Sequence, residues 1–489
     1  MKIKFPSFKT YRSRFVFFTL LYVCFFAKPW GSVVGSIYAH DDVVYYAQTV
    51  SLVNDFDTDI TNNLGPFVSG NWMKVPGEGQ ENRKHVVSFE PLGPSTLYII
   101  PYILTKPLVY FISFFRGVSY DAYDPLFFIM LSFFTLILFY FSGEFLRKTL
   151  RLYFSGATAD LVSFFVLWGT ILPVYVFRRP IYGVIPEFFF TTLIIYLLLY
   201  LLNKAAKPVS LIGITTLGIL SGFLLITRWN DIHIILFCCL TILLMGWQKN
   251  ECDVHKTRFY YCGYALLFLF IVLVFFFLTQ GMVWISNYGG IGKFVSFFYY
   301  LVRDYIGAGG TSINIFGISF NWLRNLTQIF LGWDWGLFFT MPVLVIGGYV
   351  FIRNSGKILK QVRTPSFLLA LFTFLFPLII ILKWRNTGEY YGYRFMISLL
   401  PLASVGFAFL LENNSQRGRK ILEALVLIFC FLTFFVILPF EYTDSTTLVQ
   451  GVASMGGRGW KNDAYVINAL KFYFQANPIV LAGAFLRGY

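Results

Sequence analysis

Two adjacent aspartates, Asp41 and Asp42, are the strongest candidates for chemistry in this sequence. They open a stretch in which Val43, Ala47 and Val50 recur at helical spacing. A carboxylate that is partly desolvated and crowded by a like charge can act as a general base near neutral pH. The structural alternative is an aspartate at a helix N-cap, accepting hydrogen bonds from backbone N–H groups. Both interpretations predict a helix that begins at the two aspartates.

The composition indicates where this helix lies. The chain has 489 residues, of which 57% are hydrophobic and 13% are charged, and its mean hydropathy is +0.67. A soluble globular protein carries about 25% charged residues, so this chain lacks the charge to cover a water-facing surface. Apolar runs near the roughly 20 residues of a membrane-crossing helix recur along it, and such runs must satisfy their backbone groups internally. The sequence therefore predicts an all-α polytopic membrane protein.

The apolar runs predict about eleven transmembrane helices in one integral membrane domain, residues 1–489. The expected spans are 15–36, 125–142, 157–177, 183–202, 209–227, 232–247, 260–279, 337–352, 366–382, 396–411 and 421–438. Three long segments fall on one side: the first outer (periplasmic) loop 37–124, a second outer loop 280–336 and the C-terminal outer segment 439–489. In the first loop, apolar stretches interrupted by Pro101 and Pro107 predict helices that lie in the membrane interface rather than across it.

The charges give the expected orientation. Of the 39 Lys and Arg, 20 fall in or near the short loops on the other side, with 6 of the 24 Asp and Glu. The positive-inside rule assigns these loops, and the N-terminus, to the cytoplasm. The net charge of +15 is then a topology signal with added attraction to anionic membrane lipids, and no nucleic-acid partner is expected.

Several motifs resemble the GT-C glycosyltransferases, which include protein O-mannosyltransferases and lipid A aminoarabinose transferases. Asp41-Asp42-x-x-Tyr45 is similar to the acidic motif after their first span, and Phe89-Glu90-Pro91 to the segment that leads into their interface helices. Further stretches that resemble the family begin at Pro186-Glu187, Gly222, Gly332 and Tyr391, the last two being similar to a bacterial branch. The resemblance covers about four-fifths of the chain, with every motif on the expected outer side.

The resemblance implies a membrane enzyme that moves a sugar from a polyprenyl-phosphate carrier to a lipid, glycan or protein acceptor, with inversion at the anomeric carbon. Asp41 matches the family's catalytic acidic residue, whose carboxylate would act as general base, and Asp42 matches the residue next to it. The departing phosphate needs cations, and paired guanidinium groups suit it. The expected binding residues are Arg394, Arg228, Tyr45, Glu90, Arg385 and Lys383, and Arg178 and Arg179 are nearby by topology. The alternative for each arginine is an interface anchor or snorkelling side chain. The bacterial inner membrane is the expected location.

Two other functions share these features. A transporter or flippase of lipid-linked saccharides would predict charged groups at mid-membrane and repeat symmetry, and the sequence has neither. A polysaccharide polymerase concentrates arginines and histidine in a late outer loop, whereas the acidic pair here is early. Four His without H-E-x-x-H spacing and six Cys without a C-x-x-C pair predict no metal site. Some GT-C enzymes use a divalent metal at the acidic loop, so that cofactor stays open.

Overall fold

The computed structural model describes residues 10–26, 40–60, 62–63, 91–177, 179–203, 210–248, 254–283, 337–362 and 394–443. Every element assigned within these ranges is a helix, as expected from the composition. The elements are α1 (Tyr11–Phe26), α2 (His40–Val50), η2 (Ser51–Asp55), α4 (Gly93–Arg116), α5 (Pro125–Arg151), α6 (Gly156–Trp168), α7 (Leu172–Phe177), α8 (Val184–Asn203), α9 (Leu211–Thr227), η3 (Trp229–Asp231), α10 (Ile232–Gln248), α11 (Val254–Phe276), η4 (Phe277–Gly281), α15 (Leu337–Thr340), α16 (Pro342–Arg353), α17 (Ser355–Val362), η6 (Arg394–Leu399), α19 (Leu400–Glu412) and α20 (Gln416–Thr443).

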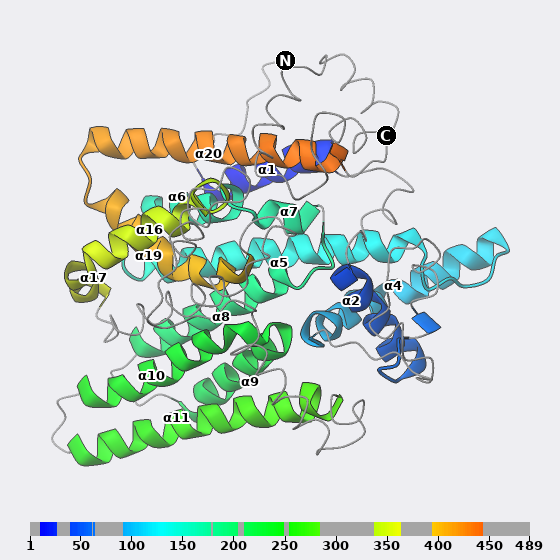
Figure 1. Ribbon diagram of the computed structural model, residues 1–489, viewed down its shortest axis with the longest axis horizontal. Coiled ribbons are helices and arrows are strands. Elements are labelled where there is room, and N and C mark those ends of the chain that lie inside the picture. Colours follow the sequence, from blue (N-terminus) through cyan, green and yellow to red (C-terminus); the bar gives the residue numbers. More distant parts are fainter. Residues whose placement is uncertain are drawn as a thin grey trace, which may run out of the picture.

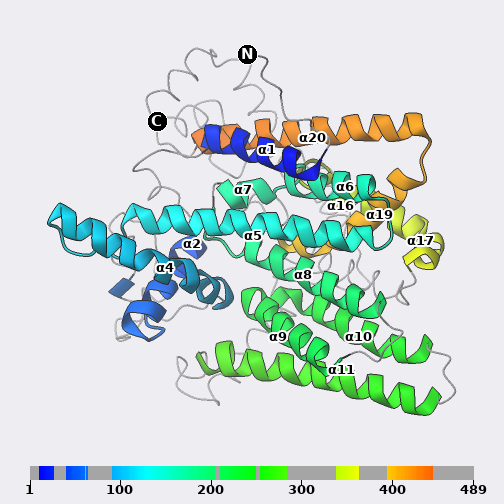
Figure 2. The ribbon, with the colours of Figure 1, turned by 180° about the vertical axis from the view of Figure 1, so that it is seen from behind.

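Most helices lie side by side, and α2 and α4 gather at one end of the bundle (Figure 1, right). The start of α20 and the whole of α17 lie at the opposite end, as the view from behind also shows (Figure 2). One buried core joins residues of α1, α5, α6, α7, α8, α15, α16, α17, η6, α19 and α20. A second joins α8 to α11, and a third packs α2 and α4 against α5.

Four helices of the described ranges are long and apolar enough to cross a membrane, as an integral membrane protein requires. They are Gly93–Arg116, Pro125–Arg151, Val184–Leu201 and Arg258–Gly281. Five further apolar helices have 10–17 residues, so the structure does not show the expected eleven spans. One reason is visible at 157–177, where α6 ends at Trp168 and a separate short helix begins at Leu172. The expected span 366–382 lies outside the described residues.

The first outer loop differs from the sequence expectation. The stretches around Pro101 and Pro107 were expected to be two short interface helices, but α4 is one helix of 24 residues through both prolines. A proline in a helix removes one backbone donor, and in membrane helices nearby hydroxyl groups can satisfy freed backbone groups. The carbonyl groups that lose their backbone donor are those of Leu97 and Ile103, four residues before each proline, and the helix continues past both. The expected interruption is therefore wrong.

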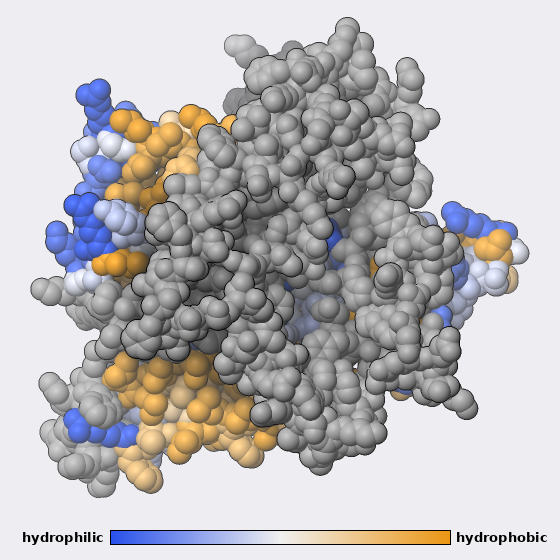
Figure 3. Space-filling model, viewed as in Figure 1, coloured by the Kyte–Doolittle hydropathy of each residue, from blue (hydrophilic) through white to orange (hydrophobic). Residues whose placement is uncertain are grey.

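The apolar exterior fits a bilayer environment. Large side chains along α11 are exposed, among them Leu266, Phe270 and Leu273 at 61–64%. Apolar surface is visible over the lower and upper helices, with hydrophilic residues at the end where α17 lies (Figure 3). This separation of apolar flank and polar end is the pattern that a membrane-spanning bundle needs.

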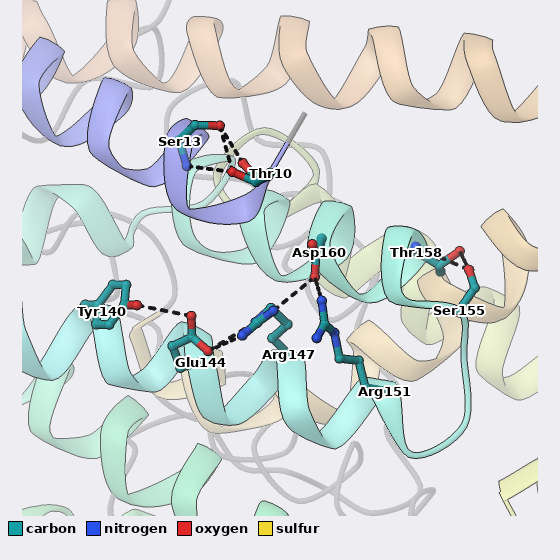
Figure 4. Close-up of polar contacts among 9 residues, drawn as sticks. All are labelled: Thr10, Ser13, Tyr140, Glu144, Arg147, Arg151, Ser155, Thr158 and Asp160. Atoms are coloured by element: carbon teal, nitrogen blue, oxygen red, sulfur yellow. Dashed lines mark hydrogen bonds and ion pairs between the residues drawn. The ribbon is translucent and has the colours of Figure 1, made fainter. Parts of the chain in front are cut away.

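An ionic network ties helices together at the end opposite α2 and α4 (Figure 4). Asp160 of α6 accepts from Arg151 of α5 at 2.8 Å and lies 3.5 Å from Arg147, which also pairs with Glu144. Glu412 at the end of α19 accepts from the Thr158 hydroxyl at 2.6 Å. The basic end of α5, expected on the cytoplasmic side, is thus held by carboxylates of α5 itself and of α6.

The pair α16–α19 is packed closely enough to require glycine on both helices. A Cβ atom added at Gly406 would overlap the backbone carbonyl of Gly347, and one at Gly347 would overlap that of Ala403. Neither obstacle is a movable side chain, so the helices would have to separate.

We predict that Gly406→Ala lowers the free energy of unfolding by about 1–3 kcal/mol, the usual cost of overpacking. Thermal unfolding in detergent, followed by tryptophan fluorescence, measures it. The matched control is Gly263→Ala on α11, where an added Cβ meets no atom within 4 Å. Equal midpoints for the two variants would contradict the close α16–α19 packing.

Candidate active site

The acidic pair lies in the first turn of α2, at the end of the bundle where α4 begins. Asp42 is buried, with 1% of its surface exposed. Its carboxylate lies 3.6 Å from the Nε atom of Arg179, whose side chain is 17% exposed. The side chain of Asp41 lies outside the described residues. The structure therefore brings one expected acid next to an arginine that was expected nearby by topology alone.

A second buried ion pair joins α8 to α9. Glu187, in the first turn of α8, is fully buried, and its carboxylate lies 3.0 Å from the Nε atom of Arg228. Arg228 caps the C-terminus of α9. Asp231, in the next turn, is 2% exposed. Two carboxylates thus surround one expected phosphate-binding arginine.

Tyr182 lies between the two ion pairs. Its ring centroid is 5.1 Å from the guanidinium carbon of Arg179 and 5.9 Å from that of Arg228. The ring of Tyr45, an expected site residue, meets it edge-on at 6.3 Å. Tyr175 stacks with it at 5.4 Å. The guanidinium carbons of the two arginines are consequently no more than 11.0 Å apart, the sum of their distances to one ring centroid.

The loop that carries Arg179 is held by its neighbouring carbonyl group. The Pro180 carbonyl accepts from the Tyr98 hydroxyl at 2.8 Å and from the Thr135 hydroxyl at 2.6 Å. Gly183 faces Pro94 and the Tyr45 hydroxyl, and a Cβ atom there would lie 3.0 Å from the proline ring. Helices α4 and α5 thereby fix the approach of Arg179 to Asp42.

The start of α4 is fixed by three other helices. Gly93 packs against Thr227 of α9 so closely that a Cβ atom would overlap the Thr227 backbone. The backbone N–H of Leu92 donates to the side-chain oxygen of Gln280 at 2.7 Å, and Ser95 donates to Gln48 of α2 at 2.6 Å. Gln280 lies in a π-helical turn at the end of α11, an irregularity that is frequent at functional sites.

The other expected site residues are placed less completely. Arg394 is the first residue of η6, and its side chain lies outside the described residues. The same helix reaches the cluster through Ser398, whose hydroxyl is 3.2 Å from Nε2 of His233. Glu90, Lys383, Arg385 and Arg178 all lie outside the described residues.

Tyr182, Asp231 and Gln280 were not anticipated. None belongs to a motif with characteristic spacing, so the sequence offered no signal for them beyond the basic pair before Pro180. Among the residues that the structure describes, no group of three or more His, Cys, Asp or Glu is arranged to hold a metal ion. The described cluster offers carboxylates that can accept protons and guanidinium groups that can donate hydrogen bonds to an anion, in an environment of low dielectric constant where both interactions are strong.

Asp231 lies in the turn between α9 and α10, where its titration bears on stability. Burial raises the pKa of Asp231 to about 7, because desolvation outweighs the attraction of Arg228 and a hydrogen bond with Ser398. The unfolded carboxyl titrates near pH 4. Between these values the folded state holds a proton that the unfolded state has released, so stability falls as the pH rises.

We predict that the free energy of unfolding of the wild type decreases from pH 5 to pH 7 more steeply than that of Asp231→Asn. One such group contributes a slope of at most about 1.4 kcal/mol per pH unit. Thermal midpoints in detergent across this range measure the difference, since asparagine mimics the protonated acid. Parallel pH profiles of the two proteins would contradict the assignment.

Comparison with known proteins gives structural neighbours only. No protein-family model matches the sequence, and no curated protein matches it significantly. The structure resembles the archaeal oligosaccharyltransferase AglB from Archaeoglobus fulgidus in complex with an inhibitory peptide and a dolichol-phosphate (TM-score 0.48, 14% identity, 88% of this chain and 56% of that one). It also resembles the Archaeoglobus fulgidus oligosaccharyltransferase in the apo form, with TM-score 0.48 and 12% identity over 94% of this chain and 60% of that one. A third match is the same enzyme in complex with Zn and sulfate, with TM-score 0.46 and 13% identity over 94% of this chain and 52% of that one.

These neighbours are oligosaccharyltransferases. This chain spans somewhat more than half of their length. At such identities and TM-scores, the likeness carries no residue role and no substrate from that enzyme to this chain.

Proposed function

We propose that this protein is a membrane glycosyltransferase that transfers a sugar from a polyprenyl-phosphate carrier to a lipid, glycan or protein acceptor. The observation that carries the proposal is the buried cluster of Asp42, Arg179, Glu187 and Arg228 around Tyr182. It brings two guanidinium groups together for the leaving phosphate, and it includes Asp42, the direct chain neighbour of the proposed proton acceptor Asp41. The acidic motif that resembles GT-C enzymes forms one side of it.

In the proposed reaction, the carboxylate of Asp41 accepts the proton of the acceptor hydroxyl group. The acceptor oxygen attacks C1 of the sugar from the side opposite the phosphate, so the C1–O bond to the phosphate breaks with inversion. The bonding electron pair leaves with the phosphate, which is a good leaving group once cations stabilise its charge. Arg228, Arg179 and Arg394 supply these cations, and Asp42 holds Arg179 in place.

The proposed orientation places this cluster on the outer face, with the N-terminus in the cytoplasm of a bacterial inner membrane. The cluster forms where α2 and α8 begin and α9 ends. The basic residues near Asp160 lie at the other ends of these or neighbouring helices. Charges at helix ends suit an enzyme at the membrane surface, whereas a transporter that relays charge would need them at mid-membrane.

We predict that wild-type protein, purified with native lipids, releases free polyprenyl phosphate from one of a panel of polyprenyl-phosphate sugars when a membrane extract supplies the acceptor. Loss of a general base costs roughly 10²–10⁴-fold in rate, so Asp41→Asn is expected to fall in that range. Asp42→Asn is expected to lose about 10–100-fold, because Arg179 loses its buried partner.

The matched control is Asp121→Asn, an exposed aspartate of the same loop that is expected to retain wild-type release. Folded yield is compared for all variants. Equal release from wild type and Asp41→Asn would remove Asp41 from the mechanism. The absence of release with every donor would favour the flippase alternative, which a liposome flipping assay then measures.

A further inference from the structure

Tyr182 occupies a position that the proposed reaction does not explain. It lies in the short connection between α7 and α8 and is 1% exposed. Two guanidinium groups from different elements lie within 6 Å of its ring centroid, Arg179 at 5.1 Å and Arg228 at 5.9 Å. Each arginine also pairs with a separate buried carboxylate, Asp42 or Glu187. The ring is thus in contact with both ion pairs.

The chemistry of these contacts differs from that of the ion pairs. An arginine presents its N–H donors in the plane of the guanidinium group, while the face of that plane can interact with an aromatic ring. An aromatic ring attracts a cation without accepting its N–H bonds, and this attraction strengthens when the cation is desolvated. The ring can therefore hold an arginine while its donors exchange one anion for another.

Binding of a phosphate would require the arginines to exchange their carboxylate partners for the phosphate. Arg179 and Arg228 are both engaged with carboxylates in the structure, and two cations brought to one phosphate repel each other. A ring between them restrains both without adding a negative charge that would repel the phosphate. The packing around the ring limits its movement, since Tyr175 stacks on it and Tyr45 meets it edge-on.

We propose that Tyr182 is a positioning residue whose aromatic face holds Arg179 and Arg228 as a pair while their N–H donors bind the carrier phosphate. This inference rests on the proposed function, because the phosphate is that of the donor and of the released carrier. The alternative is that Tyr182 only fills space between α7 and α8. The two differ in one property: a cation–π contact depends on the electron density of the ring, and packing depends on its shape.

The test replaces Tyr182 by phenylalanine and by phenylalanines carrying one, two or three ring fluorines. Fluorine withdraws electron density from the ring face with little change in shape, and the hydroxyl group is absent throughout the series. Two quantities are measured for each protein: the affinity for polyprenyl phosphate itself, and kcat/KM for its release from the sugar donor. The control series places the same residues at Phe127, a buried ring stacked on Tyr102.

The expected result is a stepwise loss along the Tyr182 series, reaching about 10–100-fold in polyprenyl-phosphate affinity and in kcat/KM at three fluorines. The Phe127 series is expected to stay flat, and Tyr182→Leu to lose at least as much as the trifluorinated ring. A flat Tyr182 series in a protein that binds polyprenyl phosphate would overturn the positioning role. Wild-type binding without sugar transfer would overturn the proposed function alone, and wild-type protein that does not bind polyprenyl phosphate would overturn both.

Discussion

The burial of charge at one end of the bundle constrains the rest of this structure. Glu187 has no exposed surface and Asp42 has 1%, so each must have a cation within a few ångströms. Leaving one such charge unpaired costs about 3–5 kcal/mol, a large part of the 5–15 kcal/mol by which a domain is stable. The positions of Arg179 and Arg228 are therefore fixed by electrostatics, and the helix ends that carry them follow.

These ends determine where the surrounding elements begin and stop. The turn after α7 must present Arg179 to α2, and the Pro180 carbonyl, with two hydroxyl donors, keeps it there. The end of α9 must present Arg228 to α8, and Gly93 allows α4 to begin directly against that end. Burial of these ion pairs would be unfavourable by itself, and the apolar cores of the surrounding helices supply the stability that offsets it.

Much of this could be predicted from the sequence because it depends on composition and local pattern. The all-helical class follows from apolar runs, and the helix at the acidic pair follows from the spacing of Val43, Ala47 and Val50. The selection of Arg228 as a candidate site residue followed from a motif at the end of an apolar run, and its role stays a prediction. The count of spans could not be fixed this way, because a run such as 157–177 does not reveal that α6 ends at Trp168, before Gly169, and that a second helix begins at Leu172.

The features that sequence reasoning missed depend on contacts between distant segments. Tyr182 acquires its role only because elements from three parts of the chain meet at its ring. The side-chain oxygen of Gln280 accepts a hydrogen bond from the backbone N–H of Leu92, 188 positions away in the sequence, and the π-helical turn that carries Gln280 was not predicted by any local pattern. The continuity of α4 through Pro101 and Pro107 likewise depends on its surroundings, which outweigh the usual effect of proline on a helix.

The most direct test of the central claim is a cryo-EM structure of Asp41→Asn in lipid nanodiscs with bound polyprenyl phosphate. The account predicts density for the phosphate in contact with the guanidinium groups of Arg179 and Arg228, beside the ring of Tyr182. Polyprenyl phosphate bound with its phosphate away from both arginines, for example at the opposite end near Arg147 and Arg151, would contradict it.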